Sequence, residues 1–358
     1  MALQRYFSGA ARVQRVGRRK APARPSTNGV PPGDFFSRGD VTVHFGRAED
    51  LYSRWPTPTC IIVDGPYGIG GFPGDTPTVA GLPEWYAPHV AAWSSYSTPQ
   101  TTLWFWGSEF GWATVHPLLV ANHWEFRNCH VWDKGIGHIA GNANTQTLRK
   151  FPVVTEVCVQ YVKAARFRFG QGEVSMQYWL RLEWARSGLP LSQTNQACGV
   201  KNAATRKYFT RCHLWYYPPP EMFERFVDYA NRHGRPEGRP YFSIDGKRPL
   251  SGDEWTKLRA KFSCAVGISN VWHAPPVRGS ERFKDTLRCL HNNQKPLQLM
   301  DIAIRASTDP GDVVWEPFGG LCSAAVAAHA LKRKCVAAEI IPEYYLAAKE
   351  RLATYDAE

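Results

Sequence analysis

The chain has 358 residues, with 43 lysines and arginines against 31 aspartates and glutamates, and a formal charge of +12. This length can bury one large core or two smaller ones, and the basic excess favours a polyanionic partner. Nine cysteines without CxxC spacing argue against a zinc cluster or a disulfide framework. No apolar run approaches the roughly 18 residues that span a bilayer, and no secretory signal is recognisable. We therefore expect a cytoplasmic protein with no metal site and no membrane partner.

The first segment, residues 1–38, carries eight lysines and arginines, five of them between Arg12 and Lys20. Its apolar content is low, and proline and glycine follow the basic cluster. This composition predicts a flexible basic arm. The arm either follows DNA phosphates or is a solvated tail without a defined partner.

Apolar and amphipathic segments alternate over residues 39–164 and again over residues 286–358. The first stretch predicts strands at 41–45, 60–63, 101–106, 126–132 and 153–162 and helices at 83–96 and 109–122. The second predicts helices at 295–306, 323–332 and 342–353 and strands at 312–315 and 335–340. Such alternation indicates an α/β fold, with a mostly parallel sheet covered by helices on both faces.

Residues 165–285 break this rhythm and are basic and aromatic, which predicts a mainly helical insertion. The segments 179–186, 192–198 and 202–210, with a turn at 187–190, have the spacing of a helix-turn-helix. In that case four basic residues lie on or beside a helix that reads a DNA groove: Lys201, Arg206, Lys207 and Arg211. A helix pair with an exposed basic face is the alternative.

The segment Asp64-Gly65-Pro66-Tyr67 follows the predicted strand 60–63 directly. The exocyclic amine of adenine or cytosine is a poor nucleophile, so a catalyst must accept hydrogen bonds from it. Asp64 offers a carboxylate acceptor, Gly65 a carbonyl acceptor and Tyr67 a ring on which an extruded base can stack. An ordinary β-turn is the alternative for the isolated tetrapeptide.

The segment Glu316-Pro317-Phe318-Gly319-Gly320 lies between the predicted strand 312–315 and an alanine-rich helix. A Gly-Gly turn lets the backbone approach a ligand closely. Glu339 ends the next predicted strand, near the ~20-residue spacing at which an acidic side chain meets ribose hydroxyls in nucleotide-binding βαβ units. A glycine turn followed by a solvent-facing glutamate is the alternative.

The two motifs in this order resemble the β-group of DNA amino-methyltransferases, in which a D/S-P-P-Y segment precedes the recognition insertion and the cofactor segment comes last. Three other segments are similar to motifs of that family: residues 291–297 to its H-P-T-Q-K-P-L, residues 309–318 to its N-P-G-D-x-V-x-D-P-F, and residues 342–352 to its closing helix. Shorter groups occur where the family has similar residues: Arg127-Asn128, Trp132-Asp133-Lys134 and Thr155-Glu156. The resemblance covers residues 41–163 and 270–354. Three residues depart from the family pattern: Gly65 stands for proline, Glu316 for aspartate and Cys322 for glycine.

The resemblance implies a Rossmann-like methyltransferase fold that binds S-adenosylmethionine. Its catalytic residues would be Asp64, Gly65, Pro66 and Tyr67, which hold and activate a flipped base. Its cofactor segment would contain Glu316 and Gly319, with Phe318, Gly320 and Glu339 at the adenosine and Asn293 and Lys295 near the methionine end. For the site to work, these two distant loops must meet in one cleft.

The implied activity is site-specific methylation of double-stranded DNA. Adenine N6 is favoured because family members acting on cytosine N4 mostly begin the catalytic segment with serine. The alternatives are cytosine-N4 methylation, methylation of adenosine in RNA, and a DNA-binding relative without catalysis. A cognate restriction endonuclease is a compatible partner, and both a monomer and a homodimer are compatible with the sequence.

Overall fold

The structure is a computed structural model that describes residues 29–70, 75–138, 149–236, 238–279, 281–282, 284–285, 288–289 and 293–355. Residues 1–28 of the predicted arm and His291 lie outside the described residues. The chain divides into two compact units. The sheet unit contains the described residues up to Ser97, together with Thr101–Lys163 and the chain from Lys261 onward, and the helical unit contains Thr98–Gln100 and Ala164–Ala260.

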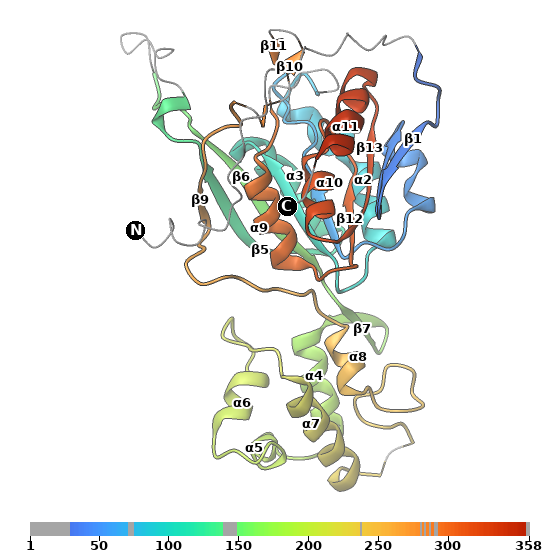
Figure 1. Ribbon diagram of the computed structural model, residues 1–358. Coiled ribbons are helices and arrows are strands. Elements are labelled where there is room, and N and C mark those ends of the chain that lie inside the picture. Colours follow the sequence, from blue (N-terminus) through green and yellow to red (C-terminus); the bar gives the residue numbers. More distant parts are fainter. Residues whose placement is uncertain are drawn as a thin grey trace. The chain divides into compact units, whose positions relative to one another are not determined.

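A nine-stranded sheet organises the sheet unit, in the order β1-β2-β13-β12-β3-β4-β6-β5-β9 (Figure 1). The strands are β1 (Phe35–Arg38), β2 (Val41–Phe45), β3 (Cys60–Val63), β4 (Thr102–Gly107), β5 (Trp124–Asp133), β6 (Thr155–Lys163), β9 (Val271–His273), β12 (Val313–Glu316) and β13 (Lys334–Glu339). The five strands from β2 to β4 are all parallel. The prediction of a mostly parallel sheet is therefore confirmed for its centre, while β1 and β6 run antiparallel to their neighbours.

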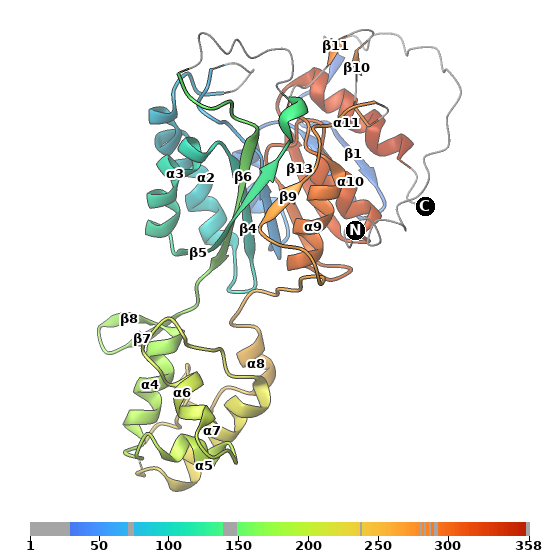
Figure 2. The ribbon, with the colours of Figure 1, turned by 90° about the vertical axis from the view of Figure 1, so that its left-hand side faces the viewer.

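Helices cover both faces of this sheet, as Figure 2 shows. One face carries α2 (Leu82–Tyr96) and α3 (Glu109–Ala121), and the other carries α9 (Leu297–Ser307), α10 (Ser323–Ala330) and α11 (Pro342–Thr354). Strand β3 explains the arrangement, because Cys60 and Ile62 pack in the core beneath α9 and α10 while Ile61 and Val63 pack beneath α2 and α3. A strand buried on both faces needs a continuous apolar sequence, which is what residues 60–63 provide.

Shorter elements complete the sheet unit: the 3-10 turns η2 (Ala48–Asp50), η3 (Tyr52–Arg54), η4 (Val79–Gly81) and η5 (Ile136–His138), and a small ladder of β10 (Lys284–Asp285) and β11 (Arg288–Cys289). No helix in the described part of the chain is long and apolar enough to cross a membrane.

The helical unit contains the hairpin β7 (Arg166–Phe169) and β8 (Gly172–Ser175), and the helices α4 (Met176–Arg186), α5 (Gln193–Ala197), α6 (Ala203–Tyr208), α7 (Pro220–His233) and α8 (Gly252–Thr256). Its core is aromatic, with Trp179, Trp184, Phe226 and Trp255 all buried. Phe223 and Trp255 stack with ring centroids 4.2 Å apart. The predicted mainly helical insertion is thus observed, and aromatic burial holds it together.

Two predicted boundaries are corrected. The arm cannot extend to residue 38, because Phe35–Arg38 pairs with β2 and Asp34 accepts a hydrogen bond from the Tyr345 hydroxyl (3.0 Å). The insertion ends at Ala260 instead of residue 285, because Val271–His273 forms β9 and pairs in parallel with β5 in the sheet unit. Both errors concern short strands, of which one forms a hairpin with the next strand and the other pairs with a strand that is distant in sequence.

Candidate functional site

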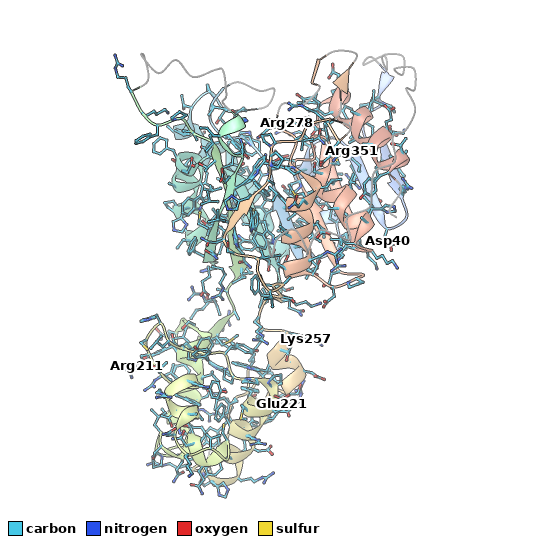
Figure 3. All side chains as sticks on the ribbon, turned by 60° about the vertical axis from the view of Figure 1, so that its left-hand side comes forward. Asp40, Arg211, Glu221, Lys257, Arg278 and Arg351 are labelled. Carbon is cyan, nitrogen blue, oxygen red and sulfur yellow. The ribbon has the colours of Figure 1, made fainter. Side chains whose placement is uncertain are left out.

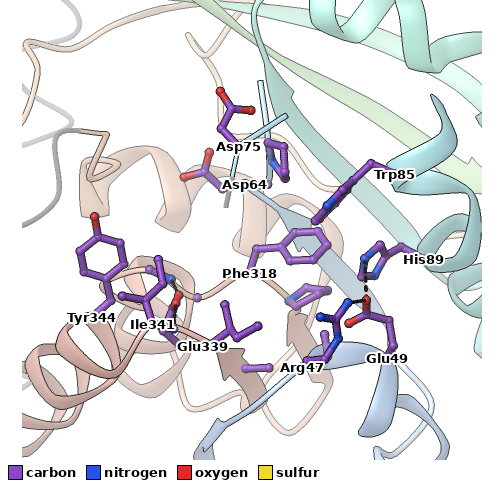
Figure 4. Close-up of a pocket in the computed structure, with 18 of the residues that line it drawn as sticks. Arg47, Glu49, Asp64, Asp75, Trp85, His89, Phe318, Glu339, Ile341 and Tyr344 are labelled. Carbon is purple, nitrogen blue, oxygen red and sulfur yellow. Dashed lines mark hydrogen bonds and ion pairs between the residues drawn. The ribbon is translucent and has the colours of Figure 1, made fainter. Parts of the chain in front are cut away.

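A cavity of about 290 Å³ opens at the carboxyl ends of β2, β3, β12 and β13 (Figure 4). Asp64–Tyr67 follows β3 and lines one part of it, while Pro317–Gly320 follows β12 and, with Glu339 at the end of β13, lines another. Because these strands are parallel neighbours, their carboxyl ends share one edge of the sheet, where ligands bind in open α/β folds. The expectation that the two distant loops meet in one cleft is confirmed.

Asp64 is half-buried and its carboxylate is held by two donors. Lys295 Nζ lies 2.8 Å from Oδ1 and 3.0 Å from Oδ2, and the Tyr67 hydroxyl lies 3.1 Å from Oδ1. Burial raises the pKa of Asp64, and Lys295 opposes this shift. Lys295 therefore favours the ionised form of this carboxylate against the effect of burial.

Asp75 fixes the loop that follows the catalytic segment. Its carboxylate accepts hydrogen bonds from four successive backbone N–H groups, those of Tyr67, Gly68, Ile69 and Gly70, at 2.8–3.0 Å. The sequence analysis missed this residue, which lines the cavity. An aspartate placed shortly after a glycine-rich turn is the signal that could have found it, since aspartates often bind backbone N–H groups of nearby turns.

The structure explains why glycine occupies position 65. A Cβ atom there would lie 2.6 Å from the Tyr86 hydroxyl oxygen and 2.8 Å from Phe318 Cδ2. The same Tyr86 hydroxyl donates to the Pro66 carbonyl (3.1 Å). Tyr86 and Phe318 therefore fill the space that a side chain at position 65 would need, and the family proline is replaced by a residue that admits them.

Glu316 does not line the cavity. It is 3% exposed, and its two carboxylate oxygens accept the N–H groups of Ala324 (2.9 Å) and Ala325 (2.8 Å) in the first turn of α10. Burial raises its pKa to about 8, against the opposing effect of these two N–H donors. Its position supports the start of α10 beneath the cofactor segment, so any effect on a ligand would act through that turn.

The turn between β12 and α10 is tightly constrained. Cys322 has φ of 53° in the left-handed region, where a residue other than glycine is strained. Gly320 also has a positive φ (52°), and a Cβ at Gly319 would lie 2.7 Å from the Cys322 sulfur. The cysteine that replaces the family's glycine therefore adopts a conformation that favours glycine, and its sulfur leaves no room for a side chain at position 319.

Glu339 lies at the cavity wall and is oriented by backbone donors. Oε2 accepts from the Gly320 N–H (2.5 Å) and Oε1 from the Ile341 N–H (2.7 Å). Burial raises its pKa to about 7 despite these hydrogen bonds. These two hydrogen bonds connect the Glu339 carboxylate with the turn after β12 and with the residues after β13, and Glu339 lies at the end of β13 as predicted.

An aromatic group surrounds Phe318 and was missed by the sequence analysis. The Phe318 ring lies 4.9 Å from that of His89 and 5.1 Å from that of Trp85, measured between centroids. Burial lowers the pKa of His89 to about 4, so the imidazole is neutral. Its Nδ1 pairs with the Tyr52 hydroxyl (2.9 Å) and its Nε2 faces Glu49 Oε1 (3.4 Å; Figure 4). The helical spacing of Trp85 and His89 on α2 indicates only a buried face, so no local signal marks them as site residues.

The two residues expected near the methionine end have different positions. Asn293 lines the cavity, whereas the Lys295 side chain is completely buried and its ammonium group contacts Asp64. Glu156 and Lys134, which the family resemblance had marked without a role, complete this group of charges.

The four predicted DNA-binding residues lie on the helical unit. Lys201, Arg206, Lys207 and Arg211 are all exposed, and Figure 3 shows Arg211 at the surface of this unit. Arg206 and Lys207 belong to the last turn of α6, which has only six residues. The predicted basic face therefore exists, on a helix shorter than the sequence spacing suggests.

A family model described as DNA methylase matches residues 59–350, which is most of the chain. The chain belongs to the N6/N4 DNA methylase family. The match begins just before β3 and ends in α11, so it includes both motifs and the helical unit.

Two curated relatives match shorter segments. The type II methyltransferase M.BglII of Bacillus subtilis is 29% identical over 131 residues, covering 37% of this chain and 32% of the relative. The DNA adenine methyltransferase YhdJ of Escherichia coli K12 is 37% identical over 84 residues, covering 23% of this chain and 27% of the relative. The chain thus spans about a third of the length of these relatives.

Two solved structures align with most of the chain. The cytosine-N4-specific PvuII DNA methyltransferase aligns with a TM-score of 0.50 and 11% identity, covering 89% of this chain and 87% of that one. The complex of M1.HpyAVI with SAM aligns with a TM-score of 0.46 and 18% identity, covering 87% and 98%. Together with the parallel sheet and its two helical layers, the PvuII alignment confirms the predicted Rossmann-like methyltransferase fold.

Proposed function

We propose that this protein transfers a methyl group from S-adenosylmethionine to the exocyclic amine of a base flipped out of duplex DNA, with adenine N6 as the favoured acceptor. The observation that carries the proposal is the single cavity lined by Asp64–Tyr67, Phe318–Gly320 and Glu339. Membership of the N6/N4 DNA methylase family supports it. Transfer requires donor and acceptor sites within reach of each other, which a shared cavity provides.

The lining residues fit the cofactor in their chemistry. Phe318 offers an aromatic face to the adenine ring, and the Gly319-Gly320 turn lets the backbone approach the ligand. The Glu339 carboxylate can accept hydrogen bonds from ribose hydroxyls, and the Asn293 amide can meet the polar methionine end. When bound, S-adenosylmethionine supplies an electrophilic methyl group on a sulfonium.

The catalytic segment would hold the acceptor base. The amine lone pair of adenine or cytosine is delocalised into the ring, and hydrogen bonds from the amine to the Asp64 carboxylate and the Gly65 carbonyl favour its tetrahedral form. The Tyr67 ring offers a stacking face to a base outside the helix. Both acceptors directly follow β3, and contacts with Lys295 and Tyr67 hold the Asp64 carboxylate, so it is positioned before the base arrives.

The aspartate at position 64 supports adenine as the acceptor. YhdJ, one of the relatives, is named a DNA adenine methyltransferase, whereas the PvuII enzyme is named cytosine-N4-specific. M.BglII is named a type II methyltransferase, which supports a role beside a restriction endonuclease.

Expression of the protein in a host whose DNA lacks the modification, followed by single-molecule sequencing, tests the proposal. We expect N6-methyladenine at one short recurring sequence and none when Asp64→Ala is expressed at the same level. Modified cytosine instead would reassign the acceptor base. Purified protein that methylates structured RNA but not duplex DNA, or that binds no S-adenosylmethionine in calorimetric titration, would refute the DNA methyltransferase proposal.

The basic face of the helical unit is proposed to contact DNA phosphates. Replacing Arg206, Lys207 and Arg211 together by alanine should weaken binding and reduce the slope of log K against log salt by up to ~0.9 per lost phosphate contact. A charge-matched control is the triple alanine variant of Arg232, Lys247 and Lys257, which are exposed elsewhere on the same unit. If the salt dependence of DNA binding were the same for the wild type and the variant lacking Arg206, Lys207 and Arg211, the DNA would bind to another surface.

A further inference from the structure

Three charged residues beside the cavity have no role in the proposed function so far. Lys295 is 1% exposed and Glu156 is 7% exposed, and both lie next to Asp64 and Tyr67. Lys134, directly after β5, forms an ion pair with the other oxygen of Glu156. Two cations and two anions together form a neutral group, in which mutual attraction and hydrogen bonds offset the desolvation penalty of burying the charges.

The contacts distinguish the two oxygens of Asp64. Oδ1 faces two donors, Lys295 Nζ at 2.8 Å and the Tyr67 hydroxyl at 3.1 Å. Oδ2 faces the same Lys295 ammonium at 3.0 Å, the longer of its two contacts. Because Asp64 also lines the cavity, Oδ2 is the oxygen better able to accept a further hydrogen bond from a ligand.

Glu156 and Asn293 hold the Lys295 ammonium in place. Glu156 Oε2 lies 3.4 Å from Lys295 Nζ and 3.0 Å from the Tyr67 hydroxyl. In the orientation that satisfies both neighbours, the Asn293 amide donates to Glu156 Oε1 (3.2 Å) and accepts from Lys295 Nζ (3.1 Å). Every donor of the ammonium group therefore has an acceptor, which leaves none for the carboxylate of a bound cofactor.

We propose that Lys295 is a positioning residue for methyl transfer, which keeps Asp64 ionised and orients its Oδ2 toward the target amine. Glu156 holds the Lys295 ammonium group and the Tyr67 hydroxyl in the positions that this requires. The inference rests on the proposed function and concerns the same site. It replaces the expected role of Lys295 at the methionine end of the cofactor.

The electrostatics agree with the geometry. Burial raises the pKa of Asp64 even though Lys295 opposes the shift, so removing the lysine should raise this pKa further. Burial alone would lower the pKa of Lys295, but Asp64 and Glu156 outweigh it and raise that pKa. A protonated Asp64 would lose its charge and much of its strength as an acceptor. The other titratable groups that act electrostatically with Asp64 are Glu156, Tyr67, Tyr86, Cys158 and Glu316.

The test compares Lys295→Met with Lys295→Arg in the full-length protein. Single-turnover methylation of unmethylated plasmid DNA is measured from about pH 6.5 to 9.5, alongside calorimetric titration of S-adenosylmethionine and thermal unfolding. Lys295→Met should lower the rate at pH 7 by about 100-fold, within the range expected for a group that controls an acid–base residue. The rate should recover as the pH rises, because Asp64 then ionises without its partner, and Lys295→Arg should retain most of the rate at pH 7.

Lys261→Met is the matched control. Lys261 also bridges two carboxylates, Asp309 at 2.7 Å and Asp312 at 2.8 Å, in the same unit but outside the cavity lining. The Lys261→Met substitution should change the unfolding temperature without shifting the pH dependence of the methylation rate. If Lys295→Met fails to fold, the double variant with Glu156→Gln removes one cation and one anion together and should show the same alkaline shift.

Two results would overturn the inference. An unshifted pH profile in a folded Lys295→Met protein would show that the lysine does not control Asp64. A loss of S-adenosylmethionine affinity that accounts for the whole loss of rate would place Lys295 at the cofactor. Both require an active wild-type protein, whereas a wild type that methylates no DNA would contradict the proposed function itself.

Discussion

Asp64 and Glu339 line the cavity, and each lies near a second carboxylate, Glu156 or Glu316, that is buried behind the cavity wall. On the base side, Asp64 and Glu156 pair with lysine side chains. On the cofactor side, Glu316 and Glu339 accept hydrogen bonds from backbone N–H groups. Their pKa values follow this difference only in part. Lys295 and Lys134 outweigh burial and lower the pKa of Glu156, whereas burial raises the pKa of Asp64 despite Lys295 and raises those of Glu316 and Glu339 to about 8 and about 7.

The difference separates two ways of holding an acid. A lysine partner supplies a full charge that favours the ionised carboxylate; the two lysines outweigh burial at Glu156, whereas Lys295 only opposes it at Asp64. Backbone donors orient the oxygens but supply only partial charges, so the proton remains exchangeable near neutral pH. The lysine partners therefore favour charged acceptors on the base side before any ligand arrives, while on the cofactor side Glu339, which lines the cavity, retains an ionisation that a ligand can change.

Removing the acceptor on the base side should have the largest effect. We expect Asp64→Ala to lower single-turnover methyl transfer by about 1,000-fold or more, because the amine loses its charged acceptor. Cofactor affinity should stay within about threefold, since Glu339 and Phe318 are untouched. Asp64→Asn is the control that keeps the side-chain volume and removes the charge. Near-normal activity in Asp64→Ala would contradict the assigned role.

The cofactor side should respond in affinity first. Glu339→Ala removes the acceptor of two backbone N–H groups and of the proposed ribose hydroxyls, and hydrogen bonds to charged groups are worth about 1.5–3 kcal/mol. We therefore expect calorimetry to show about 10- to 100-fold weaker binding of S-adenosylmethionine, with the rate at saturating cofactor nearly retained. Unchanged affinity would remove Glu339 from the cofactor site.

Gly65 lies where the two sides touch, because its missing side chain makes room for Phe318. Gly65→Ala should displace the Phe318 ring or the Tyr86 hydroxyl at a cost of about 1–3 kcal/mol for overpacking. We expect cofactor affinity and transfer rate both to fall, by about tenfold each. Adding Tyr86→Phe removes the nearest clashing atom and should restore part of the loss. An alanine variant with unaltered affinity and rate would show that this contact does not couple the sides.

The elements that form the edge of the cavity could be predicted from the sequence, because local patterns mark them. The continuous apolar run 60–63 and the strand-glycine-helix pattern around Phe318 need no knowledge of distant residues. The partners of Asp64 could not be predicted in this way. Glu156 reaches Lys134 because β5 and β6 are antiparallel, with Trp132 opposite Glu156, and such a register is set by tertiary pairing.

The two misplaced boundaries have different causes. Residues 35–38 were assigned to the arm because the segment 1–38 as a whole is basic and poor in apolar residues, yet they form a hairpin with the adjacent strand β2. Residues 271–273 were assigned to the insertion, yet β5 pairs with them. Likewise, Glu316 was expected at the cofactor from its place in a motif, and only the packing of α10 shows that its oxygens are already occupied.

The prediction with the smallest expected effect tests the difference between the pKa values of Glu316 and Glu156 directly. Glu316 has an ordinary pKa of 4.5 and a pKa of about 8 in the folded protein, so the folded state retains a proton that the unfolded chain releases. Its contribution to stability is full below pH 4.5 and is lost as the pH rises to about 8. Glu316→Gln should therefore flatten the fall in unfolding temperature between pH 5 and 8, even if it lowers the temperature throughout.

Glu156→Gln provides the matched comparison on the base side. Because the pKa of Glu156 is lowered in the folded state, its contribution is present above the ordinary value of 4.5 and is lost only as the pH falls below it. Its replacement should leave the slope between pH 5 and 8 nearly unchanged. Equal flattening by both substitutions would mean that lysine partners and backbone donors hold buried carboxylates in the same protonation state, and the distinction between the two sides would fail.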